Sequence, residues 1–194
     1  MKKFFKKIFF KINAKSRVFF YKLLSDNKVE GPISFIQATQ VVGAGKIISH
    51  KNVKIGYFPS PYFFSTYSYF EARMPNALIE IGENTRINNG FVAIAESSCI
   101  KIGKNCFIGT QVEIIDSDFH ALSSLDRANG IQHKSNLVQI GDNVFIGSNV
   151  KILKGVSIGD GAVVANSAVV TKDIPPNTIA AGIPASVLRE IQNA

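Results

Sequence analysis

Aliphatic residues recur at every sixth position in three runs between Ile81 and Val170. The repeat occupies Ile81 and Ile87, then Ile102, Ile108 and Ile114, and then Ile140, Ile146, Ile152, Ile158, Val164 and Val170. A small or medium apolar residue follows most of these positions by four, as Val144 and Val150 do. Neither the 3.6-residue period of a helix nor the 2-residue period of a strand explains this spacing, whereas a hexapeptide solenoid does.

Such a solenoid is a triangular prism in which about three hexads make one coil and the aliphatic position of each hexad points inward. Polar pairs between the aliphatic positions, such as Asp142-Asn143 and Asp160-Gly161, suit the corners because they tolerate turn conformations. Successive coils stack as parallel strands, so that each coil covers the open edge of the last. The pattern therefore predicts an all-β fold, with the prism beginning near Gln40.

Three insertions interrupt the repeat, and insertions in a solenoid emerge on one face that often binds ligands. Residues 57–70 hold eight aromatic residues, which we expect to cap the first coil; the alternative is a stacking surface for sugar rings. Residues 93–101 shift the register of the hexads by three positions. The third insertion, over residues 121–139, is a polar loop.

The first 25 residues predict a basic amphipathic helix. From Phe4 to Leu24 the chain has no Gly or Pro, and an apolar stripe follows helical spacing through Phe5, Ile8, Phe9, Ile12, Phe19 and Leu23. Lysines occupy much of the remaining helix surface, so we expect residues 1–25 to lie on an anionic membrane surface. The alternative is that the stripe packs on the protein body or on a neighbouring subunit.

At the other end of the chain, Pro175-Pro176 stops the repeat. Pro184 then opens a short segment that favours a terminal helix as far as Ile191. We therefore expect three parts: a helical arm over residues 1–26, a β-helix domain over residues 27–178 with its loop at 121–139, and a C-terminal segment over residues 179–194.

The net charge of +8 belongs entirely to the arm. Residues 1–25 contain eight Lys or Arg and no Asp or Glu, which leaves 14 basic and 14 acidic residues in the rest of the 194-residue chain. A neutral body argues against a surface that binds nucleic acid. No stretch approaches the roughly 20 apolar residues of a membrane-spanning helix, and lysines interrupt any signal-peptide core.

Cysteine and histidine spacing gives no sign of a metal site. Cys99 and Cys106 fit neither a disulfide framework nor a metal motif, so we expect a reducing cytoplasm and no metal. A zinc enzyme built on such a prism would need three converging histidines. The three histidines, His50, His120 and His133, are dispersed, and of these only His120 falls on a repeat position.

The hexads IGDNVFIGSNVKILKGVSIGDGAVVANSAVV, the ending VTKDIPPNTIAAGIPASVLREI and the earlier IIDSDFH carry a resemblance that covers residues 79–191. The chain resembles hexapeptide-repeat acetyltransferases of the galactoside and maltose O-acetyltransferase type. This resemblance implies a left-handed parallel β-helix, acetyl-CoA as co-substrate, and a homotrimer whose active sites lie between neighbouring prisms. The basic arm and the aromatic insertion are more similar to members that modify bacterial surface polysaccharides, which implies a sugar or polysaccharide acceptor.

His120 is the candidate general base. Counting six from Ile114 reaches His120, which therefore takes an inward repeat position where the chain leaves the prism for the long loop. Transfer of an acetyl group to a hydroxyl needs a base for the hydroxyl proton, and an imidazole titrates near neutral pH. Asp116 and Asp118 lie close enough in sequence to orient the ring; alternatively, they cap backbone N–H groups in a turn.

The same resemblance implies the acceptor contacts. Asn89 corresponds to an asparagine that contacts the acceptor and the tetrahedral intermediate, and Asn88 beside it is a further acceptor contact. Glu96 falls where family members often have an acid that meets the sugar. From its residue type alone, Asn89 is also suited to a corner, because asparagine tolerates left-handed backbone geometry.

Acetyl-CoA is expected in the groove between neighbouring prisms, where backbone groups of the later hexads bind its pantetheine arm. The resemblance assigns to it the side chains of Ser148, Asn166, Thr171, Lys172 and Arg189. Lys172 and Arg189 are the cations available for its phosphates, and the alternative for both is ordinary surface charge.

The reaction expected from these residues is direct transfer, with backbone donors that stabilise the oxyanion and with neither cysteine as nucleophile. An amine acceptor, in an amino sugar or an antibiotic, is the alternative within the enzyme class. A noncatalytic scaffold on the membrane would keep the prism and the arm but would not need His120. We expect the protein in the cytoplasm, held peripherally at the inner face of the cytoplasmic membrane.

Overall fold

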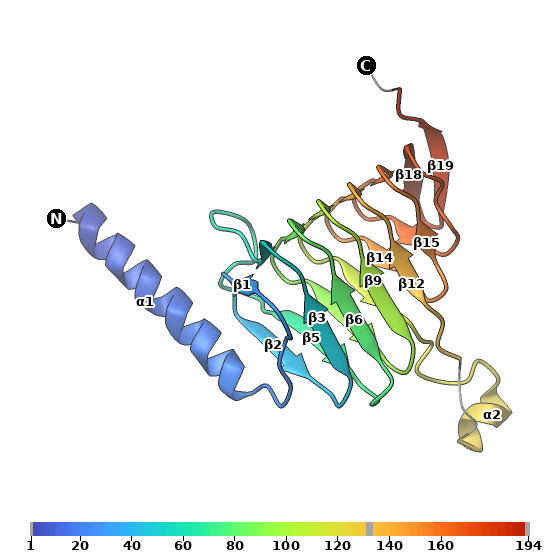
Figure 1. Cartoon of the computed structure of the whole chain (residues 1–194), viewed down its shortest axis with the longest axis horizontal. Helices are drawn as coiled ribbons and strands as arrows, with labels where there is room; N and C mark the ends of the chain where they lie inside the picture. Colours follow the sequence, from blue (N-terminus) through green and yellow to red (C-terminus); the bar gives the residue numbers. More distant parts are fainter. Residues whose placement is uncertain (1, 131–133, 193–194) are drawn as a thin grey trace.

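The structure is a computed structural model that describes residues 2–130 and 134–192, with side chains from residue 9 onward. Most of the molecule is a prism of stacked coils (Figure 1). Helix α1 (Lys2–Leu23) precedes the prism, and the short helix α2 (Ser124–Ala128) lies in the long loop.

Three sheets form the sides of the prism, and all their strand pairs are parallel except the one between β18 and β19. The eight-stranded sheet contains, in spatial order, β1 (Ile33–Phe35), β4 (Val53–Ile55), β7 (Arg86–Ile87), β10 (Phe107–Ile108), β13 (Phe145–Ile146), β16 (Val163–Val164), β18 (Thr178–Gly182) and β19 (Ala185–Glu190). The six-stranded sheet contains β2 (Thr39–Val42), β5 (Ser68–Ala72), β8 (Val92–Ala95), β11 (Glu113–Ile115), β14 (Lys151–Ile152) and β17 (Val169–Val170). The five-stranded sheet contains β3 (Lys46–Ser49), β6 (Leu78–Ile81), β9 (Cys99–Ile102), β12 (Val138–Ile140) and β15 (Ser157–Ile158).

The six-residue repeat positions pair with one another across the coils. Ile81 pairs with Ile102, Ile102 with Ile140, and Ile140 with Ile158, so one isoleucine from each coil joins a continuous stack. All four are buried in the core. Burial of each such side chain stabilises the fold by roughly 1.5–3 kcal/mol. The predicted β-helix with inward aliphatic positions is confirmed.

The polar pairs lie at corners, as predicted. Asn84, Asn105 and Asn143 have φ values of 61°, 55° and 58°, a left-handed conformation that asparagine tolerates better than most residues. Two other corners matter for the site. The aromatic edge, where the chain passes from the eight-stranded to the six-stranded sheet, carries residues 56–67 and 88–91. The loop edge, where it passes from the six-stranded to the five-stranded sheet, carries residues 96–98, 116–130 and 134–137.

Both ends of the prism differ from the sequence prediction. Because β1 pairs with β4, the prism begins before Gln40. The predicted terminal helix is wrong: the chain reverses at Gly182, whose φ is +104°, and β19 pairs with β18 in antiparallel fashion. The physical reason is that β18 ends a parallel sheet with an open edge, and main-chain pairing at that edge outweighs a weak helical preference. The expected domain boundary at residue 178 falls on the first residue of β18.

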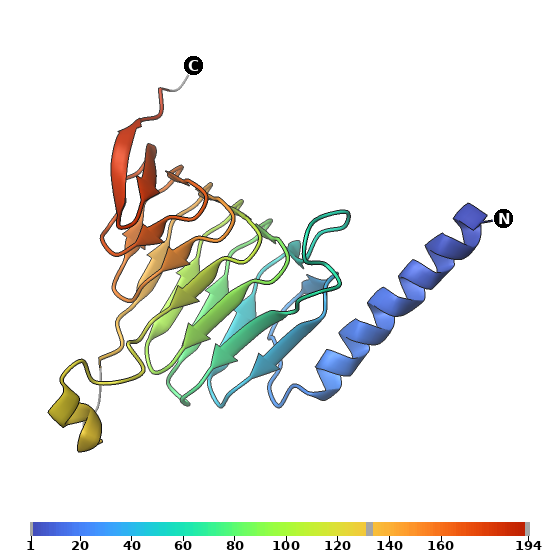
Figure 2. The ribbon, with the colours of Figure 1, turned by 180° about the vertical axis from the view of Figure 1, so that it is seen from behind.

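Helix α1 stands beside the first coils, at the opposite end of the prism from the C-terminus (Figures 1 and 2). Its half-buried positions follow the spacing i, i+3, i+4, i+7, i+8, i+11 through Phe10, Asn13, Ala14, Arg17, Val18 and Tyr21. The apolar stripe that the sequence indicated is a different one, and its described members remain exposed. Within the described residues, no helix has the length and apolar character needed to cross a membrane.

The aromatic insertion packs against this helix. The ring of Phe10 lies 4.1 Å from that of Phe58, centroid to centroid, and also contacts Phe63 and Phe64. Tyr21 contacts Tyr67 at 4.6 Å in the same way. These rings therefore serve packing, as we expected, but their main partner is α1 rather than the first coil alone.

Candidate active site

The long loop leaves the prism through a narrow neck on the loop edge. An isolated antiparallel bridge joins Ser117 to Ser135, and the backbone N–H of Asn136 donates to the carbonyl of Asp116 over 2.8 Å. The two strands of the neck are thus held together where they leave the coil, so residues 118–120 start from a fixed base.

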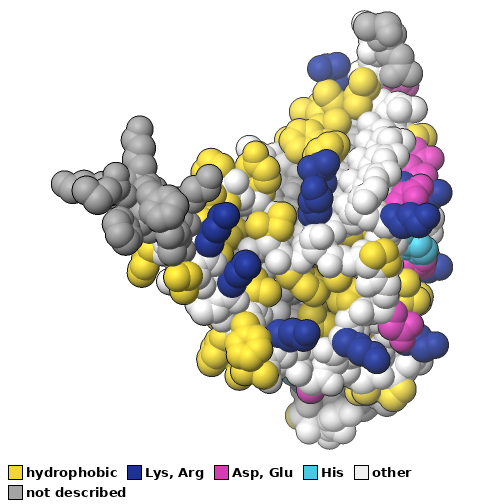
Figure 3. All heavy atoms as spheres, turned by 60° about the vertical axis from the view of Figure 1, so that its left-hand side comes forward, with side chains coloured by type: hydrophobic (Ala, Val, Ile, Leu, Met, Phe, Trp, Pro, Cys, Tyr) yellow, Lys and Arg dark blue, Asp and Glu magenta, His cyan; other side chains and the backbone are white. Residues whose placement is uncertain are grey.

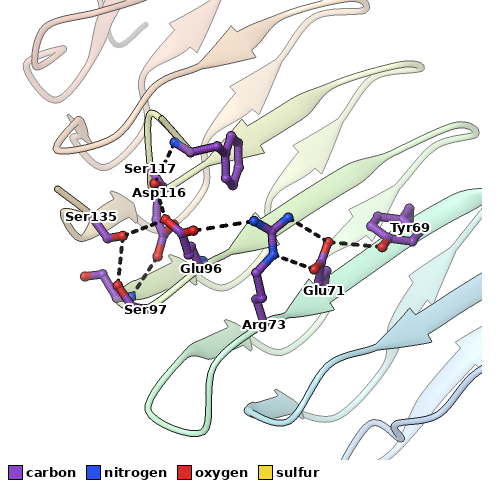
Figure 4. A network of polar contacts seen from close by, with 10 residues as sticks. Tyr69, Glu71, Arg73, Glu96, Ser97, Asp116, Ser117 and Ser135 are labelled. Carbon is purple, nitrogen blue, oxygen red and sulfur yellow. Dashed lines mark hydrogen bonds and ion pairs between the residues drawn. The ribbon is translucent and has the colours of Figure 1, made fainter. Parts of the chain in front are cut away.

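Glu96 lies beneath this neck, 7% exposed, and its carboxylate binds both strands of the neck (Figure 4). The hydroxyl of Ser117 donates a short hydrogen bond to Glu96 Oε2, and the hydroxyl of Ser135 donates to the same oxygen over 3.4 Å. Ser97 adds a hydrogen bond of 2.9 Å to the Ser135 hydroxyl. Glu96 was expected to contact a sugar; in the structure it holds the loop.

Asp116 caps a backbone turn, the alternative role that the sequence left open. Its two carboxylate oxygens accept the N–H groups of Glu96 over 2.7 Å and Ser98 over 2.8 Å. Burial raises the pKa of the Asp116 carboxyl above its ordinary value, and the two backbone donors oppose that rise. The expectation that Asp116 orients the His120 ring is wrong, because both its oxygens face the 96–98 turn.

His120 is exposed, which corrects the inward position that counting in sixes predicted. The hexad register ends at Ile114, because the chain turns outward at Ser117 and Phe119, whose φ is 58°. The N–H of Phe119 donates to the Ser117 hydroxyl over 2.9 Å, and the Arg73 guanidinium lies 4.9 Å from the centroid of the Phe119 ring. Ser117 therefore holds the backbone of Phe119 and Arg73 holds its ring, while the His120 imidazole faces outward.

Asp118 forms an ion pair with Lys154, which comes from the next coil of the loop edge. Lys154 also donates to the carbonyl of Lys134 over 3.2 Å, so it connects the two strands of the neck above Glu96. In the part of the chain that the structure describes, the Asp118 carboxylate pairs with Lys154, and its orienting role toward His120 stays a prediction.

A row of polar side chains that the sequence reading missed extends this network along the six-stranded sheet. Tyr69 donates to Glu71 over 3.0 Å, Arg73 Nε donates to Glu71 over 2.7 Å, and Arg73 Nη1 donates to Glu96 over 3.4 Å (Figure 4). Burial, together with the hydrogen bond to Glu71, raises the pKa of Tyr69 to about 12. The signal in the sequence was the alternation of Tyr69, Glu71 and Arg73, which places Tyr69 and Glu71 on the outer face of β5 and Arg73 directly after its end.

Asn88 and Asn89, both expected to contact the acceptor, differ in the structure. The Asn89 amide is fully buried; it accepts the N–H of Tyr57 over 3.0 Å and donates to the carbonyls of Tyr57 and Pro61 over 2.9 and 2.8 Å. Asn89 therefore fastens the aromatic insertion, and its expected contact with an acceptor is wrong. Asn88 lines an open cleft on the eight-stranded sheet, a position that suits the acceptor contact expected of it.

This cleft has a volume of about 440 Å³ and a mixed lining. Its apolar wall includes Tyr57, Phe107 and Phe145, and its polar groups come from Lys54, Arg86 and Asn88. In Figure 3, hydrophobic side chains and Lys or Arg side chains share the middle of the molecule, whereas the Asp and Glu side chains gather at the right of the view. An uncharged or anionic ligand with an apolar face suits such a lining.

Comparison with known proteins identifies the repeat. The model of the bacterial transferase hexapeptide (six repeats) matches residues 138–172, and that of the hexapeptide repeat of succinyl-transferase matches residues 99–115. The chain therefore contains hexapeptide repeats similar to those of bacterial transferases.

Relatives of this hexapeptide-repeat protein are acetyltransferases. The galactoside O-acetyltransferase of Escherichia coli is 39% identical over 61% of this chain and 60% of that protein. A hexapeptide-repeat acetyltransferase of Vibrio cholerae, complexed with acetyl coenzyme A, is 36% identical with a TM-score of 0.55, over 59% of this chain and 61% of that one. The chain spans less than two thirds of the length of the first curated relatives it matches.

A more distant structure extends the likeness in fold. The polySia-specific acetyltransferase NeuO is 24% identical, with a TM-score of 0.63 over 86% of this chain and 88% of that one. At this identity the likeness concerns the arrangement of the strands alone.

The residues that the sequence assigned to acetyl-CoA fall on two edges of the prism. Ser148 and Asn166 lie on the aromatic edge, where Asn166 accepts the N–H of Ser148 over 2.8 Å. Thr171 and Lys172 lie on the loop edge and line a cleft of about 300 Å³ that also includes Pro184 and Ser186. Arg189 is exposed on β19. A single copy does not bring these two groups together.

The remaining histidines lie elsewhere. His50 pairs with Glu80 over 3.0 Å on the five-stranded sheet, away from the neck, and His133 lies outside the described residues. Across residues 2–130 and 134–192, no three His, Cys, Asp or Glu side chains come together as a metal site would require.

Proposed function

We propose that this hexapeptide-repeat transferase is an O-acetyltransferase that transfers an acetyl group from acetyl-CoA to a sugar hydroxyl, with His120 as general base. The observation that carries the proposal is the position of His120: an exposed imidazole on a neck that Glu96, Ser117 and Lys154 hold rigidly. The similarity to the galactoside O-acetyltransferase supports the choice of a hydroxyl acceptor.

In the proposed reaction the acceptor oxygen attacks the thioester carbonyl while the His120 imidazole takes the hydroxyl proton. The C–O bond of the ester forms, the C–S bond breaks, and the proton passes to the departing thiolate of coenzyme A. The chain contributes by holding the imidazole in a fixed position, because displacement of a catalytic base by about 1 Å greatly lowers the rate of proton transfer. Phe119, gripped by Ser117 and Arg73, supplies that restraint.

The residues on the loop edge fit the proposed co-substrate. Thr171 and Lys172 lie on the same edge as the neck and line the cleft of about 300 Å³. A lysine ammonium and hydroxyl groups are donors that suit phosphate oxygens. Acetyl-CoA bound along this edge would extend from Lys172 toward His120.

We propose further that the active enzyme is a homotrimer. The candidate residues occupy two edges of one prism, His120 and Lys172 on the loop edge and Asn88, Ser148 and Asn166 on the aromatic edge. A groove between two copies, in which the loop edge of one faces the aromatic edge of the next, would contain both sets. Native mass spectrometry of the active protein is expected to give three times 21.2 kDa.

The proposed acceptor is a sugar of a bacterial surface polysaccharide, bound at the cleft that Asn88, Tyr57 and Phe107 line. The two free cysteines, Cys99 and Cys106, fit a reducing cytoplasm as the place of reaction. The first test is release of coenzyme A from acetyl-CoA in the presence of host glycan fractions. A host strain without this gene is expected to lose an acetyl group from its surface glycan, and an unchanged glycan together with no transfer in vitro would refute the proposal.

A further inference from the structure

We propose that α1 docks on an anionic lipid surface through its outer stripe, the exposed apolar residues Phe9, Ile12, Phe19, Phe20 and Leu23. The lipid surface is the partner, and the chemistry that recognises it is an apolar helix face bordered by lysines. This inference does not depend on the proposed reaction.

One face of α1 is already occupied by the protein itself. Phe10 packs among the rings of the aromatic insertion, Tyr21 packs on Tyr67, and Arg17 donates to the carbonyl of Thr66 over 2.9 Å. These contacts lie near both ends of the described part of the helix, so they fix its rotation about its own axis. The other face is therefore presented outward in a defined orientation.

The outer stripe consists of large apolar side chains that remain in water in the single copy. Phe9 is 71% exposed, Ile12 and Phe19 are each 63% exposed, and Leu23 is 67% exposed. They recur over more than three turns of one helix, which distinguishes them from the scattered apolar residues of an ordinary surface. The packing alternative, in which this stripe lies on the body of the same chain, is excluded because the opposite face makes those contacts.

Charge complementarity selects the partner. Residues 1–25 carry eight cations and no anion, and Lys11, Lys15 and Lys22 are exposed beside the stripe. The rest of the chain has no net charge, with 14 basic and 14 acidic residues, so a second copy carries no net negative charge and brings a second cationic arm. An anionic lipid layer supplies both an apolar boundary and negative charge at the same depth.

Vesicle flotation of the full chain tests the proposal, with phosphatidylcholine vesicles that contain or lack phosphatidylglycerol. Wild-type protein is expected to float with the anionic vesicles and to be released by high salt, because screening weakens the lysine contribution. The variant Phe19→Gln, Leu23→Gln is expected to bind at least about tenfold more weakly, since two inserted side chains are lost. Both residues are exposed, so the fold does not depend on them.

The matched control is Leu122→Gln, Leu125→Gln, two leucines of the long loop that are 80% and 72% exposed. This variant is expected to float like wild type. Equal flotation of the α1 variant and wild type would overturn the proposal. Failure of the wild type to float, with loss of an oligomer in the α1 variant, would also overturn it and would assign the stripe to a second copy.

Discussion

Ser117 stands between Glu96 and the loop that carries His120: its hydroxyl donates to the buried Glu96 carboxylate and accepts the N–H of Phe119. A buried carboxylate on the loop edge thereby fixes the backbone one residue before the candidate base. Because Glu96 also binds Ser135 and Arg73, four segments of the chain meet at one side chain. The position of His120 is a property of this assembly rather than of the histidine alone.

Replacement of His120 by Ala is expected to lower kcat for acetyl transfer by about 10²- to 10⁴-fold, the usual contribution of a positioned base. The side chain is exposed, so the melting temperature and the oligomer mass are expected to stay unchanged. Steady-state kinetics with acetyl-CoA measure the loss. His50→Ala is the matched control and is expected to retain activity; retained turnover in His120→Ala would contradict the assignment.

Replacement of Glu96 by Gln tests whether this residue positions the loop. The amide keeps an oxygen acceptor for Ser117 but loses the charge that binds Arg73, so we expect kcat to fall about 10- to 100-fold through loss of alignment. The KM for acetyl-CoA is expected to remain unchanged. Glu113→Gln, which alters a carboxylate paired with Lys151 on the same sheet, serves as control. A rise in acceptor KM alone would instead assign Glu96 to the acceptor.

The two neighbouring asparagines are expected to respond differently. Asn89→Ala leaves the backbone groups of Tyr57 and Pro61 without partners and is expected to lower the free energy of unfolding by about 1–3 kcal/mol. Asn88→Ala removes one acceptor, that of the Asn89 N–H, so it is expected to lower stability less than Asn89→Ala does, and to raise the acceptor KM because Asn88 lines the cleft. Chemical denaturation and kinetics on both variants separate the roles. Equal stability of the two variants would contradict the fastening role of Asn89.

Asp116 is expected to make stability depend on pH in the acidic range. Burial raises its folded-state pKa above the ordinary value of 3.8, so the folded protein holds this proton more tightly than the unfolded chain does. The tighter proton binding contributes to the free energy of unfolding, and this contribution is fully present below pH 3.8 and is lost as pH rises through the folded-state pKa of Asp116. The stability advantage of wild type over Asp116→Asn should therefore shrink over that interval in urea unfolding curves. A widening advantage would contradict the direction of the shift.

The prism was predictable because its signal is local and repeated. The six-residue spacing alone predicts the stack that contains Ile102, Ile140 and Ile158. The asparagines between the aliphatic positions predict the corners, where the structure shows them in left-handed conformation. The neck was not predictable in the same way. Asp118 pairs with a lysine that follows it by 36 residues, Lys154. Asp116 binds the backbone of a turn that precedes it by 20 residues. Proximity in sequence to His120 therefore did not indicate the partners of either carboxylate.

The C-terminal segment and α1 show a second limit. The preference of Pro184 for the start of a helix is weaker than the open strand edge that β18 presents, and that edge exists only once the prism has formed. On α1 the apolar spacing identified one face correctly as apolar, but it could not reveal that Phe10 and Tyr21 would find aromatic partners on the other. Both outcomes depend on surfaces that no short window of sequence contains.

The packing of Phe10 on the aromatic insertion means that the arm is not a detachable tag. Phe10 forms one cluster with Phe58, Phe63 and Phe64. Deletion of residues 1–25 would therefore expose these rings to water and promote aggregation. The same insertion is fastened at its base by Asn89 and contributes Tyr57 to the cleft. Loss of activity after such a deletion could therefore result from damage to the rim of the cleft as well as from loss of membrane binding. Substitutions on the outward side of the helix distinguish these two causes.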